Sequence, residues 1–233
     1  MSARVLIVED EDAIATGLKF NIEAEGYEAV VLGDGPSTLE YFDKHPEEVD
    51  MVILDLMLPG MSGYEICRSI RTVDQQVSIL VLSARTLSED KTHAFDCGID
   101  QYMTKPFALP ELLSRVRSLL KRSSTKSLPA DEPDTFEFGN VEVDFRKYEL
   151  TRGEETFQLT KMEVQLLRYF IANAGDVLSR TQILRDVWEQ SADVTSRTID
   201  NFVMRLRKYI EEDPGKPEHL LSVRGTGYRF VPE

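Results

Sequence analysis

Charged residues follow three short hydrophobic runs in the first half of the chain. The runs and their charges are VLIV before Glu9, Asp10 and Glu11, MVIL before Asp55, and QYMT before Lys105-Pro106. Clustered carboxylates give the all-oxygen ligand set that Mg²⁺ prefers, and a lysine offers a compact positive charge to a phosphate oxygen. A metal that cancels charge would let a carboxylate attack phosphorus. The residue types therefore predict phosphoryl chemistry if a fold brings them together.

A parallel sheet would bring these residues together. Short apolar, β-branched runs between helical stretches are typical of central strands that are buried on both faces. One such helical stretch is residues 13–25, in which Ile14, Leu18 and Ile22 fall on one face. Repeated βα units imply right-handed crossovers, so the strands all end at one edge, where the ligands of open α/β sheets bind. We expect the acids and the lysine to converge there.

The length and the pattern of the chain indicate two domains. A chain of 233 residues with 42% hydrophobic residues can build a core in each of two ordinary domains. Residues 123–134 are rich in Ser, Pro and charge, and they form the predicted linker between a first domain at 1–122 and a second at 135–233. After the linker, short strand-like pieces precede three helical stretches and a final hairpin, which indicates a separate α+β architecture.

The charge of the chain is negative but unevenly distributed. A net charge of -14 argues at first against nucleic acid, because DNA binding neutralises phosphates with lysine and arginine. One helical segment departs from this average, and its charged residues are Arg197, Asp200, Arg205, Arg207 and Lys208. With four bases against one acid, this segment keeps a local positive face that suits DNA.

The apolar runs and the cysteines indicate a reducing compartment. The runs are far shorter than the roughly 20 residues needed to cross a bilayer, and the amino-terminal run is too short for a secretory signal. We therefore expect a cytoplasmic protein without membrane contact. Cys67 and Cys97 have no metal-ligand spacing and lie in helical surroundings, so we expect reduced thiols with a structural role.

Several motifs occur together in the order and at the separations of a known family. They are VLIVEDE, VILDLMLPGMSGYE, VLSAR and YMTKPF in the first half, and RTIDNFVMRLRKYI and SVRGTGYRF in the second. With these motifs the chain resembles a two-component response regulator of the OmpR/PhoB type over nearly its whole length. The resemblance implies a flavodoxin-like receiver, which is a doubly wound, parallel, five-stranded α/β domain, followed by an α+β winged helix-turn-helix domain.

The resemblance assigns roles in phosphorylation to the receiver residues. They are Asp55 as phosphoacceptor; Asp10, Asp55 and the Met57 carbonyl as Mg²⁺ ligands, with Glu9 acting through water; and Ser83, Ala84, Tyr102, Lys105 and Pro106 in phosphate binding and switching. In this family the peptide bond before Pro106 is cis. A sensor histidine kinase would supply the phosphoryl group. Phosphorylation would draw the Ser83 hydroxyl towards the phosphate, which vacates space for the Tyr102 ring.

Charges near the end of the receiver predict a dimer interface. By resemblance, the pairs across the two-fold axis are Lys91 with Glu111, Asp96 with Arg117, and Asp100 with Arg115. Exposed ion pairs contribute about 0–1 kcal/mol each, so these pairs would fix geometry more than affinity. The alternative is an ordinary solvated helix face. Gln101 stands where relatives often carry a second acid, which weakens one contact.

Residues 197–210 form the predicted DNA-recognition helix. Apolar residues at helical spacing would face the core, namely Ile199, Phe202 or Val203, Leu206 and Ile210. The residues expected to contact DNA are Arg197, Thr198, Asn201, Arg205 and Lys208, with Arg207 as a further candidate. We expect Arg205 at a base edge, because arginine binds guanine bidentately. Phosphate contacts are expected from Arg197, Thr198 and Lys208.

The carboxyl-terminal hairpin would supply a second DNA contact. Gly225 and Gly227 allow a tight tip, and Arg224 beside them could enter a minor groove, where a narrow width concentrates negative potential. The predicted wing contacts are Arg224, Thr226, Gly227 and Tyr228, with Tyr228 at the DNA backbone. Phe202 and Met204 replace polar residues that are common in relatives, so the operator sequence stays open.

Two functions remain as candidates at this point. The first is a phosphorylation-gated transcription factor that dimerises, binds tandem half-sites of promoter DNA and contacts RNA polymerase through residues 188–196. The alternative is a Mg²⁺-dependent phosphoaspartate hydrolase or phosphatase, since receiver-like sites share their chemistry with such enzymes. The second half of the chain favours the transcription factor, which is not an enzyme, because it offers a basic helix and no further acid–base set.

Overall fold

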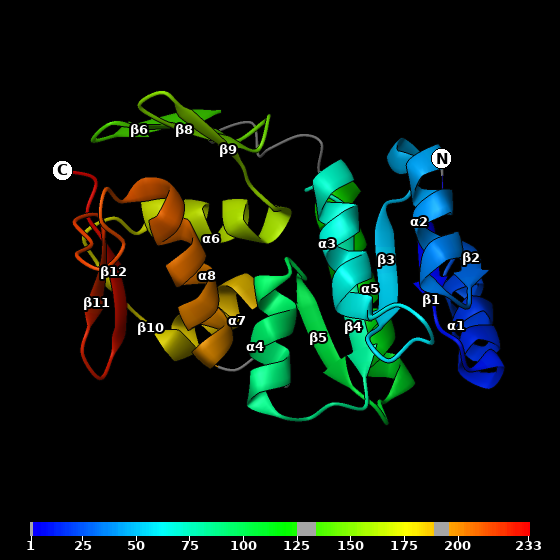
Figure 1. The fold of residues 1–233 in the computed structure, drawn as a ribbon. Helices are drawn as coiled ribbons and strands as arrows, with labels where there is room; N and C mark the ends of the chain where they lie inside the picture. Colours follow the sequence, from blue (N-terminus) through cyan, green and yellow to red (C-terminus); the bar gives the residue numbers. More distant parts are fainter. Residues whose placement is uncertain (1, 125–133, 189–195) are drawn as a thin grey trace. The chain divides into compact units, whose positions relative to one another are not determined.

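A computed structural model describes residues 2–124, 134–188 and 196–233 of the chain (Figure 1). The chain divides into two compact units, Met1–Lys126 and Ser127–Glu233. Most of the predicted linker lies outside the described residues. The last helix of the first unit continues to Ser124, inside that predicted linker, so the exact domain limits stay a prediction.

Parallel strands alternate with helices in the first unit. The strands are β1 (Arg4–Val8), β2 (Glu28–Leu32), β3 (Met51–Asp55), β4 (Ser78–Ser83) and β5 (Gln101–Thr104). The helices are α1 (Asp12–Ala24), α2 (Gly35–Lys44), α3 (Gly63–Val73), α4 (Ser88–Asp96) and α5 (Leu109–Ser124), with a 3-10 turn at Pro46–Glu48. The sheet order is β2-β1-β3-β4-β5, and each neighbouring pair is parallel. This arrangement confirms the predicted doubly wound receiver fold, in which ligands bind where the strand order reverses, between β1 and β3.

Helices cover both faces of this sheet. One core cluster joins the strands to α1 and α5, and its members include Ile7, Leu18, Ile53, Leu82 and Val116. Figure 1 shows α3 on the opposite face of the sheet from α5. Every residue of β3 is buried, as expected for a central strand that is covered on both sides and shows no polar alternation.

Close packing after β3 fixes the position of the Asp55 backbone. Helix α3 begins with a capping box, in which Ser62 and Glu65 satisfy each other's backbone amides. A side chain at Gly63 would place its Cβ 2.3 Å from the carbonyl oxygen of Asp55. Glycine is therefore required here, because the start of α3 lies directly against the end of the strand.

Antiparallel sheets flank a helical bundle in the second unit. The strands are β6 (Thr135–Phe138), β7 (Val141–Asp144), β8 (Glu149–Arg152), β9 (Glu155–Gln158), β10 (Val177–Ser179), β11 (Leu220–Val223) and β12 (Gly227–Phe230). The helices are α6 (Lys161–Ala172), α7 (Arg180–Trp188) and α8 (Ser196–Ile210). The strand orders are β6-β7-β8-β9 and β10-β12-β11. This confirms the predicted α+β winged-helix domain, although three-residue β10 is too short to show an alternating pattern and was not predicted.

Helix α8 packs its apolar face against its own unit. The buried apolar residues of α8 are Ile199, Phe202, Val203, Leu206 and Ile210. The Trp188 ring, at the end of α7, packs edge-on against Phe202 with ring centroids 5.2 Å apart. The predicted helical spacing is confirmed, and both Phe202 and Val203 face the core.

Two further predictions concern the cysteines and membrane-spanning helices. Cys67 and Cys97 are both buried, and the Cys67 thiol donates to the Cys97 carbonyl oxygen at 3.1 Å, which agrees with the structural role predicted for them. Within the described ranges, none of the helices combines the length and the apolar character that crossing a membrane requires.

Candidate functional site

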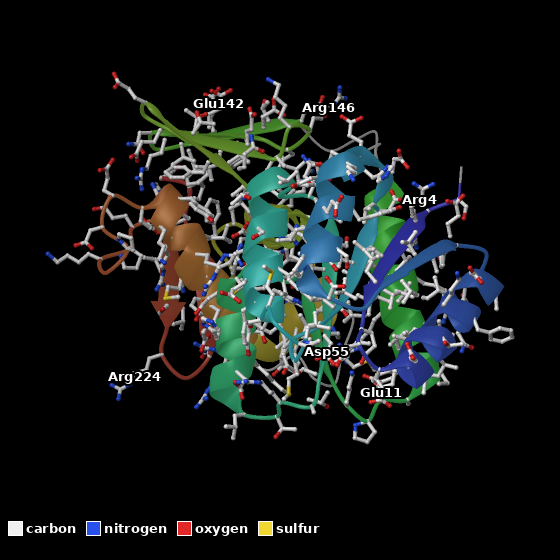
Figure 2. The ribbon with its side chains drawn as sticks, turned by 45° about the vertical axis from the view of Figure 1, so that its right-hand side comes forward. Arg4, Glu11, Asp55, Glu142, Arg146 and Arg224 are labelled. Atoms are coloured by element: carbon white, nitrogen blue, oxygen red, sulfur yellow. The ribbon has the colours of Figure 1, made fainter. Side chains whose placement is uncertain are left out.

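Three acids meet at the carboxyl edge of the first sheet. Ligand oxygens of Glu9, Asp10 and Asp55 all lie within 4.8 Å of one another. Glu9 and Asp10 follow β1, and Asp55 ends β3, so the two strands at the reversal of the sheet order supply all three acids. In Figure 2, Asp55 and Glu11 lie at the same end of the unit, and Arg4, at the start of β1, lies at the other. The predicted convergence of the acids is confirmed.

Lys105 joins this cluster from the end of β5. Its Nζ donates to Asp55 Oδ2 at 2.5 Å and to the two Glu9 carboxylate oxygens at 2.9 and 2.7 Å. The peptide bond between Lys105 and Pro106 is cis, as the resemblance implied. One ammonium group therefore balances two buried carboxylates, an arrangement that compensates much of their desolvation.

The pKa values of Glu9 and Lys105 reflect burial and pairing. Burial raises the pKa of the Glu9 carboxyl, and its hydrogen bond with Lys105 only partly offsets this effect. Burial alone would lower the pKa of Lys105, but hydrogen bonds with Asp55 and Glu9 outweigh it, so the pKa is raised. Pairing with Lys105 should by itself lower the pKa of Glu9, and the net rise shows that desolvation dominates at this carboxylate.

The two oxygens of Asp55 have separate partners. The Met57 amide donates to Asp55 Oδ1 at 2.8 Å, and Lys105 holds Oδ2. The Met57 side chain is 55% exposed, so its backbone and not its thioether belongs to the site. The carboxylate is fixed in orientation, which is a requirement for an attacking nucleophile.

The donor set suits a hard divalent cation. Glu9 and Asp55 are buried and Asp10 is exposed, so the cluster is closed on the protein side and open to solvent at Asp10. Carboxylate oxygens with room for water are the coordination that Mg²⁺ accepts. The residues present therefore fit the cation that the sequence predicted.

Ser83 ends β4, and Tyr102 lies in the neighbouring strand β5. The buried Ser83 hydroxyl accepts from the Arg85 amide at 3.2 Å, whereas Ala84 is exposed. The Tyr102 hydroxyl donates to the Arg85 carbonyl oxygen at 2.8 Å, and the ring is buried. Burial raises the pKa of Tyr102. Both predicted switch residues thus bond to the backbone of the β4–α4 loop.

The structure corrects one of the predicted dimer contacts. Asp100 accepts from Arg71 Nη2 at 3.0 Å and from the Ile79 amide at 2.8 Å through its Oδ2 atom. Its side chain is buried with that of Arg71. The predicted pair of Asp100 with Arg115 of a second copy is therefore wrong, because the Asp100 carboxylate already joins α3 to β4 within one chain.

Four of the other charged residues of the predicted dimer face also have partners within the chain. Arg115 donates to Glu111 Oε1 at 2.6 Å, one helical turn away on α5. Arg117 donates to Glu25 Oε2 at 2.8 Å. Lys91 Nζ lies 5.6 Å from the centre of the Tyr102 ring, and Asp96 is exposed. The pairs of Lys91 with Glu111 and of Asp96 with Arg117 stay predictions.

Two residues predicted to contact DNA turn inward on α8. Arg205 Nη2 lies 2.6 Å from Glu163 Oε1, and the exposed fractions of the two side chains are 13% and 1%. Glu163 also accepts from the Thr160 amide at 2.8 Å in the capping box of α6. A buried carboxylate requires a cation, so Arg205 holds α8 to α6 in this structure, and its predicted base contact stays a prediction. Thr198 is buried as well, which contradicts its predicted phosphate contact.

Two further predicted DNA residues hold the wing to α8. Arg207 donates to the Leu220 carbonyl oxygen from Nε at 2.9 Å and to Ser222 Oγ at 3.0 Å. The buried Tyr228 hydroxyl donates to Asp200 Oδ1 at 2.6 Å. Burial raises the pKa of Tyr228 to about 12, and the bond to Asp200 adds to the effect. Both side chains hold β11 and β12 to the helix. Burial of Tyr228 contradicts its predicted contact with the DNA backbone, whereas the DNA contact of Arg207 stays a prediction.

The tip of the hairpin keeps two of the predicted wing residues exposed. Arg224 and Thr226 are exposed, and Figure 2 shows Arg224 extending away from the hairpin. Gly225 has a φ of +75°, which favours glycine. A Cβ at Gly227 would lie 2.0 Å from the Leu178 carbonyl oxygen. Gly227 is therefore required for packing against β10, and its predicted DNA contact is corrected accordingly.

The exposed stripe of α8 contains only some of the residues predicted to contact DNA, and it also contains one residue that was not predicted. Arg197 and Lys208 are exposed and Asn201 is partly exposed, as expected. Met204 is 44% exposed on the same stripe, and it was not among the predicted contacts. Arg152 of β8 was also missed, and it donates to the carbonyl oxygens of Lys208 and Glu211 at the end of α8. Its helix-capping role depends on the tertiary fold, so no local sequence signal could reveal it.

Comparisons with known proteins agree with this architecture. Residues 5–117 match the response regulator receiver domain, and residues 153–230 match the C-terminal domain of transcriptional regulatory proteins. The sensory transduction protein RegX3 of Mycolicibacterium smegmatis is 40% identical over 226 residues, which cover 97% of this chain and 98% of RegX3. The DNA-binding response regulator MtrA of the same organism is 36% identical over 234 residues, which cover 100% of this chain and 98% of MtrA.

Solved structures show the same fold over the whole chain. The response regulator DrrB of Thermotoga maritima, an OmpR/PhoB homologue, is 29% identical with a TM-score of 0.51, covering 99% of this chain and 100% of DrrB. A mutant of RitR has a TM-score of 0.75 at 22% identity and covers 100% of both chains. The RitR likeness concerns the fold alone.

Fold and site together define a receiver joined to a winged-helix DNA-binding domain. The chain belongs to the OmpR/PhoB family of response regulators. It is a phosphorylation-dependent transcription regulator.

Proposed function

We propose that Asp55 is the phosphoacceptor of this regulator and that a sensor histidine kinase is the donor. The observation that supports this choice is the fixed Asp55 carboxylate, held by the Met57 amide on one oxygen and by Lys105 on the other. An Asp55 oxygen would form a bond to phosphorus while the phosphorus–nitrogen bond of the donor phosphohistidine breaks. Positioning and charge neutralisation supply most of the catalysis in such transfers.

The acidic cluster would hold Mg²⁺ through Asp10, Asp55 and the Met57 carbonyl, with Glu9 acting through water. Bound there, the cation would neutralise the attacking carboxylate and the phosphoryl oxygens. Lys105 would exchange its bond with Asp55 for a phosphoryl oxygen. The Ser83 hydroxyl would turn from the Arg85 amide to another phosphoryl oxygen, with the Ala84 amide beside it. These exchanges couple the phosphoryl group to the loop that also bonds Tyr102.

The regulated output would be DNA binding by paired chains. Two receivers would associate through α4, β5 and α5, with Lys91–Glu111 and Asp96–Arg117 as the remaining candidate pairs. Helix α8 would enter the major groove with Arg197 and Lys208 at phosphates, and Arg224 with Thr226 would reach an adjacent minor groove. Contact with RNA polymerase was predicted for residues 188–196, of which 189–195 lie outside the described residues. That contact and the cytoplasmic location stay predictions.

A phosphatase is the second candidate, since the same acids and Mg²⁺ could turn over phosphoesters. The match of residues 153–230 to a transcriptional regulatory domain favours a protein whose output is DNA binding. Incubation of the full chain with a chromogenic phosphoester and Mg²⁺ separates the two. Multiple turnovers per chain would support the phosphatase, and release of less than one equivalent would dismiss it.

Intact mass after incubation with a small phosphodonor tests the proposed phosphoacceptor. We expect a labile adduct of one phosphoryl group that requires Mg²⁺ and disappears in Asp55→Asn. Glu11→Gln is the matched control, because Glu11 is an exposed acid at the same edge but outside the cluster. An adduct that persists in Asp55→Asn, or that forms equally with excess chelator, would contradict the assignment.

A further inference from the structure

Helix α8 presents one large apolar side chain among polar ones. Met204 is 44% exposed, although its neighbours Phe202 and Val203 are buried. Arg197, Asn201, Met204 and Lys208 follow one another at steps of four, three and four residues, so they form a single stripe along the helix. The apolar side chain thus stands between a cation in the first turn and a cation in the last.

The position of this stripe decides which residues face base edges. When the cations at its two ends contact phosphates on either side of a major groove, the middle of the stripe lies over the bases. The middle consists of Asn201 and Met204, because Arg205 is turned to Glu163 and Arg207 to β11. Direct recognition from the middle of this stripe therefore depends on an amide and a thioether.

The chemistry of these two side chains selects the base pair. In the major groove, thymine offers an apolar C5-methyl group, and adenine offers the N6 donor and N7 acceptor that match an amide. The Asn201 Nδ2 atom is buried and has no hydrogen-bond partner among the described residues, so rotation of the partly exposed amide towards DNA would give it one. Methionine is flexible and polarisable, so it can follow the contour of a methyl group.

We propose that Met204 determines operator specificity by packing against a thymine methyl group in the major groove, with Asn201 on an adjacent adenine. The inference rests on the proposed DNA-binding function and adds the base type that the helix recognises. Met204 is a specificity-determining residue in this role, because a polar side chain would gain no binding free energy from contact with the methyl group.

Replacement of thymine by uracil tests the contact, since it removes only the methyl group. Full-length chain with phosphodonor and Mg²⁺ first selects its operator from a pool of random duplexes. Each thymine of the selected operator is then replaced singly, and affinity is measured by fluorescence anisotropy. We expect wild type to lose about fourfold in affinity at one thymine in each half-site, as for one buried methyl group. Met204→Ala should bind the two duplexes equally.

Two control variants keep the test specific. Met204→Leu retains an apolar side chain, so it should keep the difference between thymine and uracil. Val177→Ala removes another exposed apolar side chain of the same unit, in β10, and should leave the difference unchanged from wild type. The emission of Trp188, which packs against α8, reports whether each variant is folded.

The outcomes separate the inference from the proposed function. Sequence-selective binding with no uracil-sensitive position overturns the role of Met204 and leaves DNA binding intact. An equal loss in wild type and in Met204→Ala at the same thymine also overturns it, because another residue or DNA shape would then detect the methyl group. If the selection enriches no sequence, the proposed DNA-binding function fails and the inference fails with it.

Discussion

At the carboxyl edge of the receiver sheet, acids and a lysine from three different strands meet, whereas on α8 two of the four basic residues turn back into the protein. The receiver residues converge because strand ends in a parallel sheet are fixed by the backbone and its hydrogen bonds. An arginine on a helix has a long side chain, and the nearest buried acceptor decides where it points. Charge near a strand end is therefore better evidence of a site than charge on a helix.

The strongest test of this comparison is the removal of Arg205. In Arg205→Ala, the Glu163 carboxylate would remain buried without a cation, and loss of one partner of a buried pair costs about 3–5 kcal/mol. Urea unfolding followed by the fluorescence of Trp188, the single tryptophan of the chain, measures the second unit. The exposed Lys208→Ala should change the unfolding free energy by less than about 0.5 kcal/mol. Unchanged stability with lost sequence selectivity would return Arg205 to the DNA interface.

The receiver also contains a buried pair that the sequence assigned to a surface. Asp100→Asn would leave the buried Arg71 guanidinium without its carboxylate. We expect the free energy of the local opening that exposes the amides of β4 and β5 to fall by about 3 kcal/mol. Hydrogen exchange at the Ile79 amide, which donates to Asp100, should accelerate by about a hundredfold. Asp96→Asn, at an exposed acid of α4, should leave this exchange rate unchanged. If only dimerisation changes in Asp100→Asn, the original interface assignment would be correct.

The same contrast explains how far the sequence could predict the molecule. The two folds, the convergence of Glu9, Asp10 and Asp55, and the cis bond before Pro106 follow from motifs and strand ends. Whether a helical cation faces solvent depends on acceptors that are distant in sequence. Glu163, which binds Arg205, belongs to a different helix, so the pattern of α8 alone could not reveal the pair. Hydrophobic periodicity identified the buried face of α8 but not the partners of its charges.

Two adjacent basic residues of α8 give a finer test. Lys208 is exposed, and Arg207 bonds to the Leu220 carbonyl oxygen. Lys208→Ala should reduce the slope of log affinity against log salt by about 1, because one phosphate contact is lost. Arg207→Ala should leave this slope unchanged and lower the unfolding free energy by about 1–2 kcal/mol. Anisotropy titrations at several salt concentrations measure the slope, and equal slopes for the two variants would refute the distinction.

The smallest expected effect concerns the proton on Glu9. Its raised pKa keeps part of the carboxyl population protonated at pH values just above its usual 4.5, where an exposed glutamate would be mostly ionised. Because a cation favours the ionised form, Mg²⁺ binding should release a fraction of a proton at pH values just above the usual 4.5 of a glutamate and progressively less as the pH rises. Affinity for Mg²⁺ should therefore fall as the pH is lowered through the raised pKa.

Calorimetric titration of Mg²⁺ in two buffers with different ionisation enthalpies measures this proton release. Glu9→Gln should abolish the pH-dependent part, since it keeps the size of the side chain and removes the titrating group. The exposed Glu11→Gln should release protons as wild type does. Equal release from wild type and Glu9→Gln would place the titrating group elsewhere. In that case burial of Glu9 would not control metal binding, and Lys105 would hold this carboxylate ionised over the whole range.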